Sequence, residues 1–307
     1  MSVKRTIALI GGGRWARVLA GVALEAMEKT EGMVLCSPSN PEAWEGWSTE
    51  RCKVVGCLEE ALEDPEVTKV VIARKARDHA ETAKACLKRG QEVLVEKPFA
   101  VTLDQAESLL GMGGKAATGL VFRYASNLER FAEACGEVQS LKIAWEDPKG
   151  EVRHGEKKGF DPDLAMEWDV MPHVWSIAER LVGGRGWQLI KAHGSGGGDV
   201  QALFDVRGRR VEVDLKRGAS QRVRRLQVKG SWGKGEIDFA REPGQAHLNG
   251  REIDVKEGWD SPLKRQLQAF ARGGVDGLDP VTRLENAVEA LKLADQISEA
   301  SRRGQAG

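Results

Sequence analysis

The sequence predicts an α/β protein, with a doubly wound parallel sheet in the first part of the chain and an α+β domain with a large, mostly antiparallel open sheet after it. Two observations predict this fold class. Residues 6–118 alternate short apolar strands with helical stretches, the order that a parallel sheet covered by helices requires. Residues 139–239 instead alternate apolar and polar side chains between glycine turns, which is typical of antiparallel strands.

The elements follow in order along the chain. In the first part we expect strands at 7–10, 33–36, 70–73, 93–95 and 117–120, and helices at 15–27, 57–62, 78–89 and 102–110. In the second part we expect strands at 139–145, 201–206, 210–216, 222–229 and 235–239, and helices at 164–181, 262–270 and 281–301. The domains are expected at residues 1–118 and 119–275, with a C-terminal helix in 276–307 that packs back on the first domain.

The composition is that of a globular protein with a small-molecule partner. The 307 residues are enough for two domains, and 41% are hydrophobic. The 46 basic and 46 acidic side chains cancel, which argues against nucleic acid and against an acidic membrane surface. A basic cluster between Arg207 and Lys229 has the period of a strand, so we interpret it as a solvated or subunit-facing surface.

Cysteine usage and hydropathy indicate the compartment. The five cysteines are odd in number and lack Cys-x-x-Cys spacing, so neither a disulfide framework nor a metal site is expected, and the thiols should be reduced. No apolar run approaches the roughly 20 residues that span a bilayer, and the N-terminus does not resemble a signal peptide. A cytoplasmic protein is expected.

A glycine loop near the N-terminus predicts dinucleotide binding. An apolar strand leads into Gly11, Gly12 and Gly13, and a helical pattern begins with Arg14 and Trp15. The small residues at 11, 13 and 16 match the Gly-x-Gly-x-x-Gly/Ala fingerprint of Rossmann domains. In that fingerprint the glycines allow a tight turn and close approach of a pyrophosphate, which binds at the helix N-terminus.

A charge pair follows a later buried strand. The run 91–95 ends in Glu96-Lys97-Pro98, which places Glu96 and Lys97 at the carboxyl end of a parallel strand, where open sheets bind ligands. Lys97 is therefore either a solvated lysine at a strand end or a catalytic or cofactor-contacting group. The glycine loop upstream favours the second interpretation. The sequence leaves open whether the Lys97–Pro98 bond is cis.

A carboxylate and an imidazole lie one turn apart on the helix expected at 164–181. Asp169 and His173 have i, i+4 spacing, so their side chains project from the same face. A carboxylate so placed can orient an imidazole and raise its basicity, as a general base near neutral pH requires. The alternatives are a surface ion pair or a buried histidine with a satisfied partner.

The end of the second strand favours NADP(H) over NAD(H). NAD-preferring Rossmann domains usually place Asp or Glu there to bind the ribose 2′-hydroxyl. This chain has Ser37 at that place and Ser39 nearby, with no acidic residue before Glu42. A carboxylate would repel a 2′-phosphate, whereas hydroxyls can bind it. No arginine immediately follows Ser37, but Arg14 of the glycine loop could reach the phosphate.

Together these motifs resemble the Gfo/Idh/MocA family of glucose-fructose, inositol and related oxidoreductases over nearly the full length. The segments that carry the resemblance are the glycine loop, Val71-Ile72-Ala73 followed by His79, the Glu96-Lys97-Pro98 block, Trp168-Asp169 through His173, and the helices after Pro262. The resemblance implies that Lys97 contacts the nicotinamide ribose and the reacting oxygen of the substrate. It also implies that His173 exchanges the proton, while Asp169 orients the substrate or the imidazole.

The resemblance also implies which other residues line the site. It places cofactor contacts at Gly11, Gly12, Gly13, Arg14, Trp15, Ser37, Ser39, Ala73, Arg74, His79, Glu96 and Lys97. It places substrate contacts at Arg123, Tyr124, Glu167 and Trp168. Arg123 could hold an anionic group of the substrate, or it could form a structural ion pair. The chain departs from the family pattern at Arg74-Lys75 and in the segment before Asp169, so a free cyclic sugar is not clearly indicated.

The expected activity is an NAD(P)-dependent oxidoreductase that transfers a hydride between nicotinamide and a small polar substrate, a secondary alcohol or ketone such as a sugar or sugar nucleotide. An NADPH-dependent reductase of C=N bonds and a non-catalytic NAD(P)-binding regulator remain alternatives. The resemblance further implies a homodimer or homotetramer assembled through the sheet of the second domain.

Overall fold

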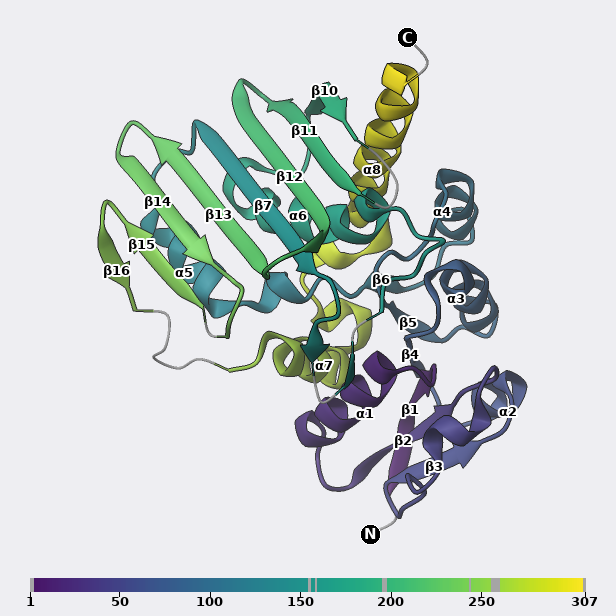
Figure 1. The fold of residues 1–307 in the computed structure, drawn as a ribbon. Helices are drawn as coiled ribbons and strands as arrows, with labels where there is room; N and C mark the ends of the chain where they lie inside the picture. Colours follow the sequence, from purple (N-terminus) through teal and green to yellow (C-terminus); the bar gives the residue numbers. More distant parts are fainter. Residues whose placement is uncertain are drawn as a thin grey trace. The chain divides into compact units, whose positions relative to one another are not determined.

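The structure is a computed structural model that describes residues 3–153, 156–157, 159–194, 198–242, 244–254 and 260–305. The chain divides into two compact units. Figure 1 labels their helices and strands. Unit 1 comprises Met1–Leu120 and Leu263–Ala287, and unit 2 comprises Val121–Pro262 and Val288–Gly307.

Unit 1 is built on a six-stranded sheet in the order β3-β2-β1-β4-β5-β6, and every pairing in it is parallel. Its strands are β1 (Lys4–Ile10), β2 (Glu31–Cys36), β3 (Cys52–Val55), β4 (Lys69–Ile72), β5 (Glu92–Val95) and β6 (Ala116–Thr118). Its helices are α1 (Arg14–Ala26), α2 (Leu58–Glu63), α3 (His79–Leu87), α4 (Leu103–Leu110) and α7 (Pro262–Gly273), with 3₁₀ turns η1 (Pro41–Trp44), η2 (Ala76–Asp78), η4 (Gly274–Gly277) and η5 (Pro280–Thr282). The predicted doubly wound parallel sheet is confirmed.

The strand order determines where unit 1 can bind a ligand. The central strand β1 is almost fully buried from Ile7 to Ile10, as its continuous apolar run predicts. The chain order reverses between β1 and β4, and ligands of doubly wound sheets bind beyond the carboxyl ends of the strands at such a point. The glycine loop follows β1, Ala73 follows β4, and the Glu96-Lys97 pair follows β5, so all three lie at this edge.

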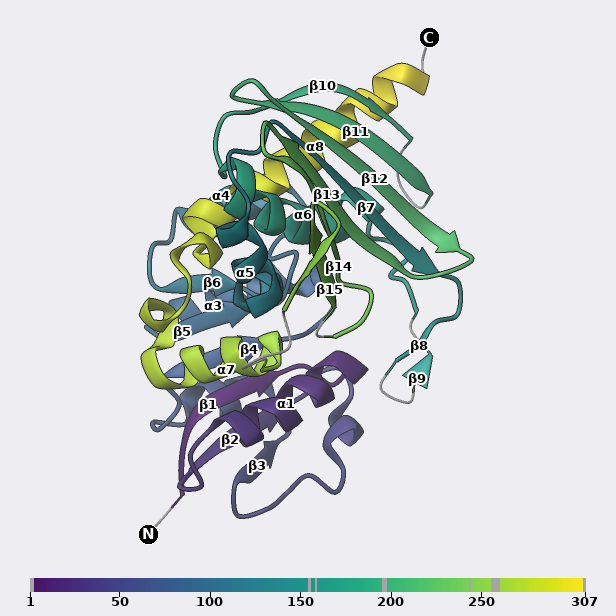
Figure 2. The same ribbon diagram turned by 90° about the vertical axis from the view of Figure 1, so that its left-hand side faces the viewer.

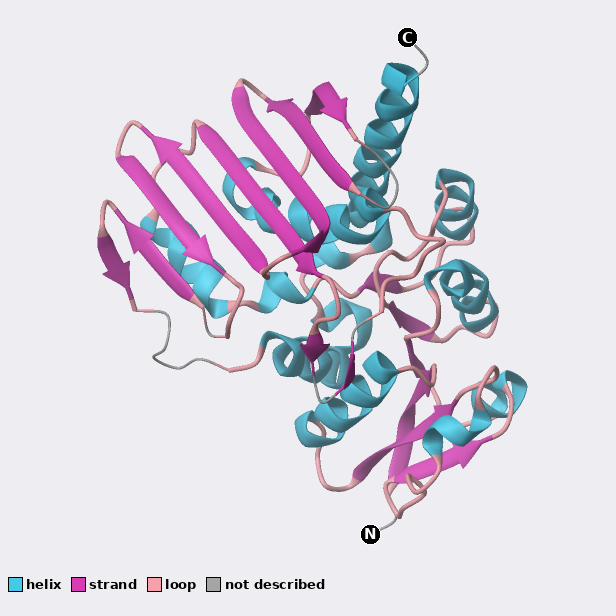
Figure 3. Ribbon diagram, viewed as in Figure 1, coloured by secondary structure: helices cyan, strands magenta, loops and turns pink. Residues whose placement is uncertain are grey.

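Unit 2 is built on an eight-stranded sheet in the order β10-β11-β12-β7-β13-β14-β15-β16. Figure 3 shows its strands in magenta. Only the β12–β7 pair is parallel, so the predicted mostly antiparallel sheet is confirmed. Its strands are β7 (Ser140–Pro148), β10 (Trp187–His193), β11 (Asp199–Val206), β12 (Arg209–Ala219), β13 (Val223–Gly230), β14 (Gly233–Asp238), β15 (Gln245–Leu248) and β16 (Arg251–Ile253), with a small hairpin of β8 (Val152–Arg153) and β9 (Glu156–Lys157). Its other elements are η3 (Val121–Tyr124), α5 (Ser126–Ala134), α6 (Met166–Val182) and most of α8 (Leu284–Gln305).

Helix α6 covers one face of this sheet and contacts β7, β11 and β12 (Figure 2). The covered face is apolar over most of its area, with Leu141, Ile143 and Val213 at most 2% exposed. Side chains on the opposite face are charged and form cross-strand ion pairs such as Lys142–Asp214 at 2.8 Å. The alternation along each strand therefore separates a core face from a polar face.

The units divide the C-terminal part of the chain differently from the domain boundaries expected from the sequence. Residues 263–275 were expected in the second domain, but they belong to unit 1. One reason is that the Glu92 carboxylate of β5 accepts the backbone N–H of Val275 at 2.6 Å. From Val288 onward helix α8 belongs to unit 2, where Ser298 donates a hydrogen bond to Glu167 at 2.6 Å.

Among the described residues, no helix is long and apolar enough to cross a membrane. The five cysteines are free thiols.

Candidate active site

Each of the three glycines in the glycine loop has a different surrounding. Gly11 has φ +151°, and a Cβ there would lie 2.2 Å from the carbonyl oxygen of Ala73. A Cβ on Gly12 would lie 2.2 Å from the hydroxyl of Ser37, whereas one on Gly13 would meet no atom within 4 Å. Gly11 and Gly12 thus allow the loop to pack against the ends of β4 and β2, and Gly13 leaves open space for a ligand.

The N-terminus of α1 is suited to a pyrophosphate. The helix begins at Arg14, its N-cap residue is Gly13, no side chain caps it, and its first turn contains no acidic residue. The positive end of the helix dipole is therefore not neutralised by a carboxylate of its own first turn, and an anion is favoured there. Arg17 donates a hydrogen bond to the carbonyl oxygen of Gly12 at 3.1 Å and so holds the loop from within the helix.

A buried tryptophan that the sequence analysis did not identify also holds the loop. Trp44 of η1 is 1% exposed and donates its indole N–H to the carbonyl oxygen of Gly11 at 2.9 Å. Its ring makes an edge contact with Trp47, with 5.2 Å between centroids. No sequence motif signals this role, because the contact joins residues 33 positions apart through the packing of η1 against the loop.

The two serines after β2 differ in accessibility. Ser37 is 1% exposed and packs against Gly12, whereas Ser39 is exposed. The Ser37 hydroxyl therefore fills the space beside the glycine loop, and Ser39 is the serine that is accessible to solvent. No acidic residue occurs between Ser37 and Pro41.

Arg74 and His79, both expected to contact the cofactor, make contacts within unit 1. Arg74 donates a hydrogen bond to the Thr82 hydroxyl at 2.8 Å and lies 3.6 Å from the Asp78 carboxylate. His79 is 2% exposed; its Nδ1 lies 2.8 Å from the carbonyl oxygen of Pro98 and its Nε2 lies 3.1 Å from that of Arg74. Burial lowers the pKa of His79. The imidazole thus links the loops after β4 and β5, and its contact with the cofactor stays a prediction.

A hydrogen bond ties the Glu96-Lys97 turn to the glycine-loop helix. The side chain of Trp15, at the start of α1, hydrogen-bonds the Glu96 carboxylate. Burial raises the pKa of Glu96, and this hydrogen bond together with the Lys97 ammonium partly opposes the shift. Lys97 is half-buried, and the Lys97–Pro98 bond is cis. Lys97 is therefore positioned next to the start of α1.

In unit 2, Asp169 of α6 is paired with an arginine from the sheet. Arg217 of β12 lies 3.1 Å from the Asp169 carboxylate and donates a second hydrogen bond to the carbonyl oxygen of Leu164 at 2.7 Å. The Arg217 side chain is only 6% exposed. The sequence analysis had included Arg217 in a solvated or subunit-facing basic cluster, which is wrong for this residue because it lies on the inner face of the sheet.

His173, one turn further along α6, lies in an aromatic environment. Its ring stacks on Trp145 of β7 with 5.4 Å between centroids and an interplanar angle of 18°. Phe122 of η3 approaches the imidazole edge-on at 5.2 Å. His173 is partly exposed, but its Nδ1 is buried. The aromatic packing thus orients the imidazole.

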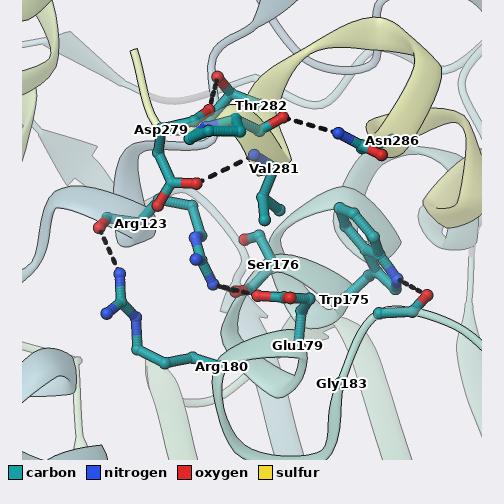
Figure 4. A network of polar contacts seen from close by, with 12 residues as sticks. Arg123, Trp175, Ser176, Glu179, Arg180, Gly183, Asp279, Val281, Thr282 and Asn286 are labelled. Carbon is teal, nitrogen blue, oxygen red and sulfur yellow. Dashed lines mark hydrogen bonds and ion pairs between the residues drawn. The ribbon is translucent and has the colours of Figure 1, made fainter. Parts of the chain in front are cut away.

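Two of the four expected substrate residues make structural contacts. Arg123 donates a hydrogen bond to the Glu179 carboxylate at 2.5 Å, and its own carbonyl accepts one from Arg180 at 3.2 Å (Figure 4). The guanidinium is 8% exposed, so the structural ion pair is the alternative that the structure contains. Glu167 is 1% exposed and accepts the hydrogen bond from Ser298.

The other two expected substrate residues, Tyr124 and Trp168, are 9% and 8% exposed.

The expected catalytic residues fall into two groups: Lys97 belongs to unit 1, and Asp169 and His173 belong to unit 2.

The first part of the chain matches a known family, and several relatives share its sequence. Residues 5–121 match the Gfo/Idh/MocA family model, described as an oxidoreductase family with an NAD-binding Rossmann fold. The chain is 28% identical over 192 residues to the uncharacterised oxidoreductase YdgJ of Escherichia coli, covering 60% of this chain and 55% of that protein. It is 32% identical over 90 residues to inositol 2-dehydrogenase of Rhodococcus jostii, covering 29% and 24%. The aligned stretches thus span about half or less of these relatives.

Solved structures share the fold of the whole chain. UDP-N-acetylglucosamine 3-dehydrogenase GnnA of Acidithiobacillus ferrooxidans has a TM-score of 0.79 at 19% identity, covering 96% of this chain and 97% of that one. KijD10, a 3-ketoreductase of Actinomadura kijaniata solved with NADP and TDP-benzene, has a TM-score of 0.76 at 18% identity and the same coverage. At these identities the likeness establishes the fold alone. Residues 5–121 thus match the NAD-binding Rossmann domain of the Gfo/Idh/MocA oxidoreductases.

Proposed function

We propose that this protein is an NAD(P)-dependent oxidoreductase that transfers a hydride between the nicotinamide and a secondary alcohol or ketone of a small polar molecule. One observation carries the proposal: the Trp15–Glu96 hydrogen bond joins the start of the glycine-loop helix to the turn that contains Lys97. A loop suited to a pyrophosphate and a half-buried lysine thus occur side by side at the switch point of the sheet. A loop that only bound a nucleotide would not need a half-buried lysine beside it.

The residues of unit 1 fit a dinucleotide. The backbone of Gly11–Trp15 would hold the pyrophosphate, since Gly13 opens to free space and the first turn of α1 has no acidic residue. Glu96 and Lys97 would hold the nicotinamide end, beyond β5. When bound, the cofactor supplies a carbon that accepts or donates the hydride.

The chain's own residues then handle the charge and the proton. The Lys97 ammonium would donate a hydrogen bond to the substrate oxygen and stabilise negative charge as it develops there. His173 would take the proton from that oxygen or return it. Asp169 would keep a fixed direction toward the imidazole or the substrate, because Arg217 holds its carboxylate at 3.1 Å.

The cofactor is proposed to be NADP(H). Support comes from the absence of a carboxylate between Ser37 and Pro41, so no side chain there would repel a 2′-phosphate. Ser39 is exposed and could donate a hydrogen bond to that phosphate, while Ser37 is buried. Titration of the intrinsic tryptophan fluorescence with NADPH and with NADH tests the preference. Tighter binding of NADH would contradict it.

The substrate is proposed to be a polyhydroxylated ring, such as a sugar or a sugar nucleotide. This rests on the named activities of inositol 2-dehydrogenase, GnnA and KijD10. The alternative of C=N reduction drew on the unusual Arg74 and Glu167, but these side chains bond Thr82 and Ser298. A panel of sugar alcohols, keto sugars and cyclic imines, followed at the nicotinamide absorbance, separates the two reactions, and no turnover would favour the non-catalytic regulator.

The catalytic assignment has a matched test. Lys97→Met should lower kcat by about 100-fold or more, since it removes the ammonium that stabilises negative charge on the substrate oxygen. His173→Gln should lower kcat by a similar factor through loss of proton transfer. Lys75→Met, which removes an exposed lysine near the same edge of the sheet, should leave kcat unchanged. Wild-type kcat in either of the first two variants would refute the assignment.

Assembly with a second copy through the polar face of the unit 2 sheet is also proposed. That face carries balanced cross-strand pairs, including Lys142–Asp214 and Lys216–Asp199, so two copies could meet there with complementary charges. Light scattering at low and high salt tests this. A monomer under both conditions would rule it out.

A further inference from the structure

A buried arginine and a tryptophan form a layer beneath His173. The guanidinium of Arg224 lies over the indole of Trp145, 3.9 Å from the ring centroid. The His173 imidazole stacks against the same indole, with 5.4 Å between centroids. Trp145 is 6% exposed and Arg224 is 3% exposed, so one desolvated aromatic ring contacts both an imidazole and a cation.

The register of the sheet creates this layer. Trp145 of β7 and Arg224 of β13 are direct partners in an antiparallel pair, so their side chains project from the same face. The neighbouring inward residues, Ile143 and Leu226, are apolar and at most 2% exposed. A charged side chain among them costs desolvation energy, and an ordinary core would place an apolar residue there.

Several contacts fix the position of the arginine. Arg224 forms a buried ion pair with Asp147, and it donates hydrogen bonds to the carbonyl oxygens of Glu146 at 2.6 Å and Val223 at 2.7 Å. Burial lowers the pKa of Arg224 to about 10, and the Asp147 carboxylate opposes the shift, so the guanidinium stays charged at neutral pH. Arg224 is therefore an immobile cation against the ring.

We propose that Arg224 and Trp145 are positioning residues for His173: the held guanidinium fixes the indole, and the indole fixes the imidazole in the orientation needed for proton exchange. This inference rests on the proposed role of His173. The same contact also acts on charge. An imidazolium is attracted to an aromatic face, but here Arg224 already occupies that ring as a cation. Removing Arg224 would therefore leave this ring free to attract an imidazolium.

The charged groups around the imidazole come from several elements. Asp169 lies one turn away on α6 and is paired with Arg217 of β12. Arg224 comes from β13 and Asp147 from β7, while Phe122 of η3 adds no charge. A variant that changes only Arg224 and Asp147 would keep the Asp169–Arg217 pair.

The test replaces the buried pair by apolar residues of similar size. In Arg224→Met/Asp147→Leu both charges disappear together, a change that buried ion pairs often tolerate. Arg225→Met is the matched control, because Arg225 is next to Arg224 in the strand. The Arg225 side chain lies on the opposite face of the sheet and is 49% exposed. The imidazole signals are titrated by NMR; the chain has only five histidines, and His173→Gln assigns the relevant signal.

We expect the titration midpoint of His173 to rise by about 0.5 pH unit in the double variant and to stay unchanged in Arg225→Met. With a turned-over substrate, kcat should fall about 10-fold while the KM for the cofactor changes less than twofold. Arg224→Lys keeps a cation for Asp147 but loses the planar contact, so it should fold even if the double variant does not, and should also lower kcat.

Two results with the variants would overturn the inference. One is an unchanged His173 midpoint in a folded double variant. The other is wild-type kcat in both Arg224→Lys and the double variant. Since the NMR titration needs no turnover, failure of the proposed enzymatic function would be seen separately, as absence of activity in the wild type together with the expected midpoint shift. Cross-peaks between the His173 and Trp145 rings in the wild type are expected, and their absence would also refute the layer.

Discussion

The interpretation of Arg123 as a structural residue makes a quantitative prediction. The Arg123 guanidinium is 8% exposed and lies 2.5 Å from a Glu179 carboxylate that is 23% exposed. Arg123→Met would leave Glu179 without this partner. Breaking a fully buried pair costs about 3–5 kcal/mol. Because Glu179 retains some access to water, we expect a loss of about 2–3 kcal/mol, which corresponds to about 3–5 °C in Tm for a protein of this size.

The assay combines thermal unfolding with steady-state kinetics. Arg123→Met/Glu179→Leu should recover most of the lost stability, since no buried charge remains without a partner. Arg185→Met, at an exposed arginine, is the control and should change Tm by less than about 1 °C. If Arg123→Met kept the wild-type Tm but raised the KM for substrate about tenfold, the arginine would bind substrate and our interpretation would be refuted.

Three further predictions concern the cofactor half of the site. Trp44→Phe removes the donor to the Gly11 carbonyl and should weaken cofactor binding up to about tenfold in a fluorescence titration, whereas Trp47→Phe should not; equal effects would exclude a specific role. Gly12→Ala would place a Cβ 2.2 Å from a serine hydroxyl and should lower both Tm and cofactor affinity, so wild-type values for both would show that the loop can adjust. Burial raises the pKa of Glu96, so ionising this carboxyl costs more in the folded than in the unfolded protein, and its contribution to stability falls as pH rises. Glu96→Gln should therefore raise Tm at pH 7.5 and leave it unchanged near pH 4; a lower Tm at pH 7.5 would contradict this sign.

Much of the fold could be predicted because its signals are local. The apolar runs of β1, β2, β4 and β5 and the glycine turns of unit 2 each occur within a few residues. The elements that the analysis missed, such as β3, β10 and β16, are edge or near-edge strands in which few residues are buried. A strand that is half exposed has little hydrophobic pattern, so its existence depends on the neighbour with which it pairs.

The site was predicted less completely for a related reason. The candidates Lys97, Asp169 and His173 follow from strand ends and helix spacing, and their catalytic roles remain predictions. The partners of these residues do not follow from spacing, because Arg217 and Trp145 approach α6 only through the register of the unit 2 sheet.

The sequence by itself determined the parallel and antiparallel sheets, the glycine loop and the position of the lysine at a strand end, because periodicity and backbone freedom act over a few neighbouring residues. Only the tertiary structure decided what each polar side chain contacts. Arg123 and Glu167 are bonded inside unit 2, His79 is buried between two loops, and Ser37 is packed against Gly12. The physical reason is that a buried charge or hydrogen-bonding group must find a partner, and packing brings that partner from distant parts of the chain.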